Sequence, residues 1–152
     1  MELIHAKETA LDFMEQFGLL ERGWTFEWHN KKRAYGSCNW KKKKIYLSEF
    51  LLPHMQYKDI KDTILHEIAH ALDSEKRGYS SHDNTWKSVA RKVGADPKSC
   101  HEKVDLPKSE FNWLHVCPKC NRWWGLYKRP RATYTCNECK EILITKKVEK
   151  GL

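Results

Sequence analysis

Two histidines and a glutamate stand close together in the stretch H-E-I-A-H, residues 66–70. Residues four apart on a helix lie one turn apart on the same face, so His66 and His70 can present two imidazoles to one metal ion. This spacing is typical of a Zn²⁺ site, with Glu67 beside the metal as a non-ligand. Zinc lowers the pKa of a bound water to about 7, and the glutamate can accept its proton as the water attacks a peptide carbonyl. The motif therefore predicts a catalytic zinc site.

Such a site needs a third protein ligand and one open position. Side chains that could supply the ligand follow the motif: Asp73, Glu75, His82, Asp83, Asp96 and His101. We favour His82, because Gly78 in the stretch R-G-Y-S-S-H can turn the chain and bring that histidine back to the metal. Asp83 is better explained as the N-cap of the next helix. A carboxylate in place of His82 is the alternative.

Four cysteines in the second part of the chain have the spacing of another metal site. Cys117, Cys120, Cys136 and Cys139 form the pattern C-x₂-C-x₁₅-C-x₂-C. The pattern is typical of two knuckles that hold Zn²⁺ with four thiolates, which leave no open position, so this zinc is expected to be structural. A unit this small can hardly fold without such a metal. We interpret Cys38 and Cys100 as small buried hydrophobic residues.

Aromatic and basic residues alternate between the two cysteine pairs. Basic groups can hold phosphates while exposed aromatic rings stack on unpaired bases, which favours a surface for single-stranded or distorted DNA. The alternative is that the aromatic residues form the core of the unit and the cations are solvated. The candidate DNA contacts are Arg122, Trp123, Trp124, Tyr127, Lys128, Arg129 and Arg131.

The charge of the chain agrees with an acidic partner such as nucleic acid. The sequence has 28 Lys and Arg against 20 Asp and Glu, a formal charge of +8, and residues 105–152 hold 10 against 5. Charged residues interrupt the N-terminal stretch, and no later segment has membrane-spanning length, so we expect no signal peptide and no membrane contact. We expect a monomer in the cytoplasm, associated with the nucleoid in a bacterium or phage. In that reducing compartment, we expect the six cysteines to be metal ligands or free thiols rather than disulfides.

Several elements must position these residues. Apolar residues at helical spacing predict a helix over residues 4–17 and another from about 57 to 75, which carries the H-E-x-x-H motif. A further helix is expected over residues 83–93, with Asp83 or Asn84 as N-cap and Gly94 at its end. Together with the strands described next, these helices predict an α+β domain.

Residues 24–30 and 43–50 have the pattern of strands in a small sheet. The segment between them contains Gly36 and could be a strand with a bend. The run Lys41 to Lys44 is either a loop or an edge strand that lysines protect from aggregation, and such an edge could receive a substrate strand. Composition changes after Val104, so we divide the chain into a domain over residues 1–105 and a zinc ribbon over residues 106–152.

Three stretches, HEIAHAL, GYSSHDNTWK and RAYGSCNWKKKKIYLSEFLL, followed by the four-cysteine unit, resemble the SprT-like family. Its eukaryotic relative Spartan is a DNA-dependent protease of proteins crosslinked to DNA. The resemblance implies a compact zincin followed by a ribbon. Its zinc would be held by His66, His70 and His82, the last in a G-x-x-x-H-x-x-x-W setting, with Glu67 as the catalytic acid/base.

For function, the resemblance implies a zinc endopeptidase that cleaves proteins bound or crosslinked to DNA, in the repair of DNA–protein crosslinks. The cofactors would be one catalytic and one structural zinc ion. The alternative is a DNA-binding or regulatory zinc protein whose zincin domain does not cleave. Intact Glu67 favours the enzyme, because a structural site needs only the histidines.

Overall fold

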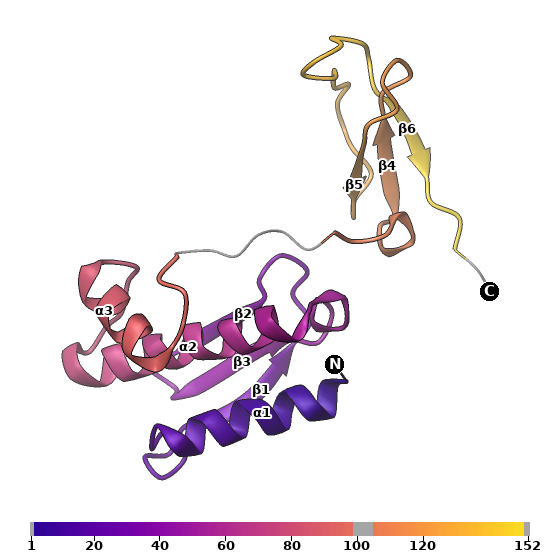
Figure 1. Ribbon diagram of the computed structural model, residues 1–152. Coiled ribbons are helices and arrows are strands. Elements are labelled where there is room, and N and C mark those ends of the chain that lie inside the picture. The colour runs from indigo at the N-terminus through magenta and orange to yellow at the C-terminus, as the bar shows by residue number, and fades with distance from the viewer. Residues whose placement is uncertain (1, 99–104, 151–152) are drawn as a thin grey trace. The chain divides into compact units, whose positions relative to one another are not determined.

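The computed structural model describes residues 2–98 and 105–150. The chain divides into two compact units, Met1–Val104 and Asp105–Leu152 (Figure 1). The sequence placed this boundary between residues 105 and 106. Cys100, expected to be a small buried residue, and His101, a candidate ligand, lie outside the described residues.

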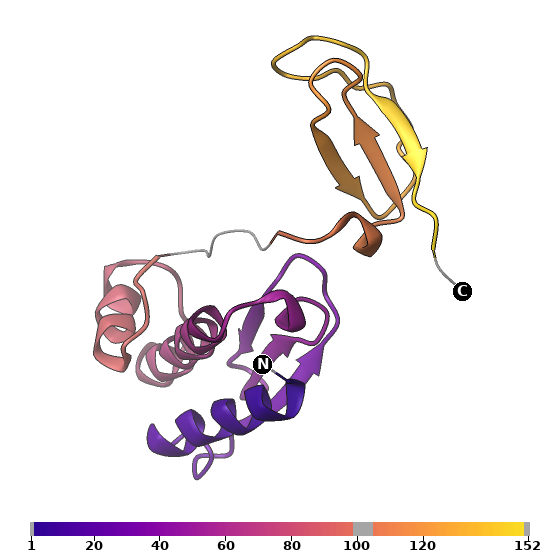
Figure 2. The same cartoon turned by 45° about the vertical axis from the view of Figure 1, so that its right-hand side comes forward.

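Helices and a small sheet form the first unit, as expected for the α+β class. The helices are α1 (Leu3–Gln16), α2 (Tyr57–Arg77) and α3 (Asn84–Val93), with a short 3₁₀ turn at Leu52–His54. The strands are β1 (Thr25–His29), β2 (Gly36–Asn39) and β3 (Lys44–Ser48). They lie in the order β1-β3-β2, β1 being parallel and β2 antiparallel to β3 (Figure 2). β2 is therefore the edge strand on the side of the sheet away from β1.

Helix α2 forms the centre of this unit. It packs against β2 and β3, while α1 packs against α2 and β1. Burial of one large aliphatic side chain contributes about 1.5–3 kcal/mol, so the apolar faces of these elements hold the unit together. Fully buried residues come from α1 (Ala6, Ala10, Met14), β3 (Ile45, Leu47) and α2 (Ile60, Ile64, Ile68).

The ends of α2 and α3 set the path of the chain near the histidines. α2 continues to Arg77, two residues beyond the expected end, and Gly78 closes it in the left-handed conformation with φ 79°. A glycine adopts this conformation without the steric cost that a Cβ adds. The Asp83 side chain then caps α3 by accepting a hydrogen bond from the Trp86 N–H. The predicted N-cap is confirmed.

The lysine run is a turn rather than an edge strand. Residues 40–43 connect β2 to β3, and Lys43 has a φ of 55°. Lys44 opens β3, which is the central strand of the sheet. The loop interpretation of the run is confirmed, and the edges of the sheet belong to β1 and β2.

The second unit is a small antiparallel sheet. Its strands are β4 (Trp113–Val116), β5 (Trp123–Leu126) and β6 (Ile144–Lys147), in the order β5-β4-β6, after a 3₁₀ turn at Lys108–Glu110. The Phe111 ring lies directly on Gly125, where any Cβ would collide with it. Among the described residues of both units, no helix is long and apolar enough to cross a membrane.

Candidate metal centres

Helix α2 and the segment after it bring three histidines together. His66 and His70 lie on one face of α2, and the chain that turns at Gly78 returns His82 to them. The Nε2 atom of His82 lies 3.1 Å from Nε2 of His66 and 3.0 Å from Nε2 of His70. The structure thus places the two motif histidines with the third histidine that the sequence favoured.

The three nitrogens suit zinc. Three imidazole lone pairs directed at one point repel one another unless a cation lies between them. Zinc–nitrogen bonds of about 2.0–2.1 Å in a tetrahedron would place the nitrogens about 3.3 Å apart. The observed separations of 3.0 and 3.1 Å are close to that value. The donor set and its spacing therefore fit a zinc ion with one position left for a non-protein ligand.

Trp86 packs against all three imidazoles. Its ring centroid lies 4.6 Å from that of His66, 4.8 Å from that of His70 and 4.8 Å from that of His82. The indole is fully buried and is nearly parallel to His70, with an interplanar angle of 20°. In the sequence, Trp86 is the tryptophan of the G-x-x-x-H-x-x-x-W setting that contains His82. In the structure its indole ring contacts the rings of all three histidines and so restricts their orientation.

Glu67 lies beside the histidines in a nearly dry position. Its Oε1 is 4.0 Å from Nε2 of His66. Burial raises the pKa of Glu67 to about 8 and lowers that of His70 to about 4, because both charged forms lose water contacts. The carboxyl group is close enough to reach a molecule at the metal position without being among the clustered ligand atoms. A cation held by the histidines would lower the pKa of Glu67 again, because a neighbouring positive charge favours the carboxylate.

An open cleft of about 690 Å³ runs past the histidines and along β2. Cys38 lies in its wall, half-buried rather than in the core as the sequence suggested, and burial raises the pKa of its thiol well above the usual range. The residues lining the cleft are Arg33–Cys38, Trp40, Thr63, His66, Glu67, His70 and Ser80–His82.

The carboxylates considered as alternative ligands are engaged elsewhere. Asp73 accepts from Arg77 and Ser80, and Asp83 pairs with the same arginine while it caps α3. Glu75 accepts two hydrogen bonds from Arg22, at 2.9 and 2.8 Å. In the described part of the chain, none of them joins the histidine cluster.

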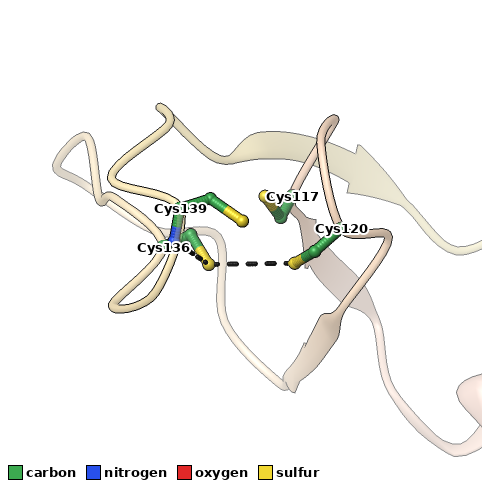
Figure 3. Close-up of side chains that lie close together, drawn as sticks. All are labelled: Cys117, Cys120, Cys136 and Cys139. Carbon is green, nitrogen blue, oxygen red and sulfur yellow. Dashed lines mark hydrogen bonds between the residues drawn. The ribbon is translucent and has the colours of Figure 1, made fainter.

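The four predicted cysteines form the second cluster. Their sulfur atoms all lie within 4.8 Å of one another, and Sγ of Cys120 is 3.9 Å from Sγ of Cys136 (Figure 3). Bonds of about 2.3 Å from zinc to sulfur in a tetrahedron would give an edge of about 3.8 Å. Backbone N–H groups of the first knuckle, that of Cys120 above all, lower the pKa of the Cys117 thiol to about 7, which favours the thiolate that binds metal.

The candidate DNA-contact residues divide between the two faces of the ribbon sheet. Trp123 and Tyr127 pack against Phe111, with ring centroids 6.0 and 5.1 Å from it, and so belong to the small core. On the other face, Trp124 is paired in register with His115, and the His115 ring lies 5.2 Å from that of Tyr134. Trp124 and Tyr134 are 38% and 52% exposed.

The cations of this group also differ in their contacts. Arg122 pairs with Glu138 at 2.7 Å, and Arg129 lies 5.5 Å over the ring of Trp113, whose strand position puts it on the same face as Trp124. We call the set of half-buried Trp113 and exposed Trp124, Arg129 and Tyr134 the aromatic face. The sequence correctly indicated exposed rings beside cations, but it could not separate them from the rings of the core.

An α+β unit with an H-E-x-x-H helix, a third histidine and a following Cys₄ ribbon has the architecture expected of a SprT-like zincin. The sequence profile of the SprT-like family matches residues 5–105, and the chain belongs to that family. Among solved structures it is similar to the metallopeptidase zymogen jannalysin of Methanocaldococcus jannaschii, with 17% identity and a TM-score of 0.46 over 57% of this chain and 79% of that one. A search of curated proteins gives no match.

Proposed function

We propose that the chain is a zinc endopeptidase that cleaves proteins bound or crosslinked to DNA. The observation that carries this proposal is the convergence of three histidine Nε2 atoms beside a buried glutamate in an open cleft. A purely structural metal site would need neither the carboxylate nor the cleft. His66, His70 and His82 would hold the catalytic zinc.

Glu67 is the proposed general base. When bound, zinc supplies Lewis-acid chemistry that activates a water molecule and polarises a carbonyl group. The Glu67 carboxylate, 4.0 Å from the ligand atom of His66, lies where it can accept the proton of the attacking water and deliver it to the leaving amine. Its buried setting keeps bulk water from competing for that proton.

Strand β2 would align the substrate. It is one of the two edge strands of its sheet, and it lines the cleft next to the histidines. An extended polypeptide can pair with the main chain of such an edge, which holds it without requiring particular side chains. Recognition through the backbone would suit an enzyme that meets many different proteins on DNA.

The ribbon would bring the enzyme to DNA. Exposed rings and cations of the aromatic face can stack on unpaired bases and hold phosphates. Binding of enzyme and substrate to one strand would raise their effective concentration without a specific protein–protein contact. The proposal includes a cytoplasmic or nucleoid location and a monomeric enzyme.

The experiment that tests this function uses the zinc-loaded chain and a protein bound to single-stranded DNA. We expect cleavage that depends on DNA and is absent from the Glu67→Gln variant. A chain that binds DNA and two zinc ions but leaves the bound protein intact would favour the alternative, a regulatory zinc protein without peptidase activity.

A further inference from the structure

A chain of hydrogen bonds connects His70 to buried Asp73 in the C-terminal part of α2. Nδ1 of His70 lies 2.7 Å from Oγ of Ser80, and this hydroxyl lies 2.7 Å from Oδ2 of Asp73. Asp73 is fully buried and receives two N–H groups of Arg77, at 2.8 and 2.7 Å. None of the proposed catalytic steps uses these residues, although they contact a proposed zinc ligand directly.

The direction of each hydrogen bond follows from chemistry. The Asp73 carboxylate, paired with a guanidinium, only accepts, so the Ser80 hydroxyl donates its single proton to it. Ser80 Oγ can then only accept from His70, whose Nδ1 must carry a hydrogen. In a neutral imidazole the other nitrogen, Nε2, therefore keeps its lone pair. Nε2 is the atom that faces His82 at 3.0 Å.

We propose that Ser80 and Asp73 are positioning residues of the zinc site, which hold His70 in the tautomer that binds metal through Nε2. The proposal rests on the zinc-binding part of the proposed function, not on cleavage. Trp86 complements this effect, because its ring is stacked 4.8 Å from that of His70 and fixes the imidazole plane. Hydrogen bonding and stacking together leave His70 one orientation.

The test compares zinc affinities of the histidine cluster in the full chain, measured by competition with a coloured chelator. Cobalt(II) substitution separates the two sites, because thiolates give charge-transfer absorption that imidazoles lack. We expect Ser80→Ala to weaken zinc binding at the histidines by about 10- to 100-fold. Ser80→Thr, which keeps the hydroxyl, should bind about as tightly as the wild type.

Asp83→Ser is the matched control. It removes the Arg77–Asp83 pairs at 2.9 Å but keeps an oxygen that can cap α3, and it leaves Ser80 and His70 in place. We expect its zinc affinity to be unchanged. Equal affinities of Ser80→Ala and the wild type would overturn the proposal. So would an equal loss in Ser80→Ala and Asp83→Ser, which would indicate general loosening of the α2–α3 connection.

A second variant tests the role of the carboxylate. In Asp73→Asn the amide can donate to Ser80, whose hydroxyl would then donate to Nδ1 and force the hydrogen onto Nε2. Exchange of an orienting carboxylate for an amide can hold a histidine in the wrong tautomer. We expect a loss of zinc affinity at least as large as that of Ser80→Ala, and unchanged affinity would overturn the role of Asp73. If Ser80→Ala and Asp73→Asn both cleaved substrate and bound zinc as the wild type does, the positioning role would be rejected. The proposed peptidase function would not be affected by that result.

Discussion

At the scale of single residues, the proposed zinc site is made of one nitrogen atom from each of three histidines, His66, His70 and His82. Each histidine offers Nε2, and the His66 and His82 nitrogens lie as close together as those of His70 and His82. His82 comes from the segment after Gly78, which the hydrogen bonds of Ser80 to His70 and Asp73 and the Asp83 cap of α3 hold in place. Substitutions can therefore separate the contribution of His82 to metal binding from that of Asp83.

We predict two zinc ions in the purified wild-type chain. His82→Ala should weaken or remove the zinc at the histidines and leave the ribbon zinc. Asp83→Ala should keep both ions and destabilise α3, by about 1 kcal/mol for the lost cap. Elemental analysis and urea unfolding check these outcomes. Loss of one zinc from Asp83→Ala, with His82→Ala unaffected, would show that the ligand is wrongly assigned.

Helix α2 and strand β2 approach each other closely where Gly36 faces Glu67. A Cβ on Gly36 would lie 3.0 Å from Cγ2 of Thr63 and from the Tyr46 carbonyl oxygen, and 3.2 Å from Cγ of Glu67. The absence of a side chain at this position lets the edge strand lie against the catalytic helix. The same contact sets the distance between the proposed base and the strand that would hold substrate.

Gly36→Ala should therefore disturb both stability and the site. We predict that the free energy of unfolding falls by about 1–3 kcal/mol, the usual cost of extra volume in a packed position. The added methyl group would press on the Tyr46 carbonyl oxygen, which belongs to the backbone of β3, and on Thr63 and Glu67, which belong to α2. Ser37→Ala, on the same strand, serves as the control and should cost much less. Urea unfolding with both zinc sites filled measures the difference. A stability of Gly36→Ala equal to that of Ser37→Ala would contradict the close packing.

Local sequence patterns were sufficient to predict the helices and strands, but not which elements pack or pair with one another. Helix geometry fixes the relation of His66, Glu67 and His70, so the sequence could predict that they share a face. The order β1-β3-β2 and the role of β2 as the edge could not be predicted, because strand propensity does not specify neighbours. The hydrogen bonds of Ser80 depend on how the chain turns after Gly78, which no spacing rule gives.

At the scale of the whole molecule, two units divide the proposed work. The first contains the histidine cluster and the cleft, and the second contains the Cys₄ cluster and the aromatic face. Among its described residues, the ribbon sheet buries few large side chains, chiefly Leu114 and His115, and the Phe111 ring on Gly125 is only partly buried. Its folding should therefore depend on its metal.

Changing Cys136 and Cys139 to serine should remove one zinc ion and unfold the ribbon. The histidine cluster should keep its zinc, since it shares no ligand with the cysteines. Elemental analysis, together with tryptophan fluorescence from the ribbon, checks this. Loss of both zinc ions would show that the first unit depends on the second for its metal.

The aromatic face should dominate DNA binding. Changing Trp124, Arg129 and Tyr134 to alanine should weaken binding of single-stranded DNA by at least tenfold, because stacking contributes about 1–3 kcal/mol per base. Binding by the wild type should fall steeply as salt rises. Lys146→Ala, on the opposite face of the sheet, is the control. Fluorescence anisotropy at two salt concentrations measures both effects, and equal affinity of the triple variant and the wild type would reject this surface.

The most direct test of the central claim is the rate at which a protein bound to single-stranded DNA is cut by the wild type and by Glu67→Gln, with zinc content measured in the same samples. We predict that the variant keeps two zinc ions and its DNA affinity while its cleavage rate falls by about 10²–10⁴, the range expected for loss of a general base. Cleavage by Glu67→Gln at the wild-type rate, or an intact substrate in the presence of wild-type chain with both zinc sites filled, would contradict the account.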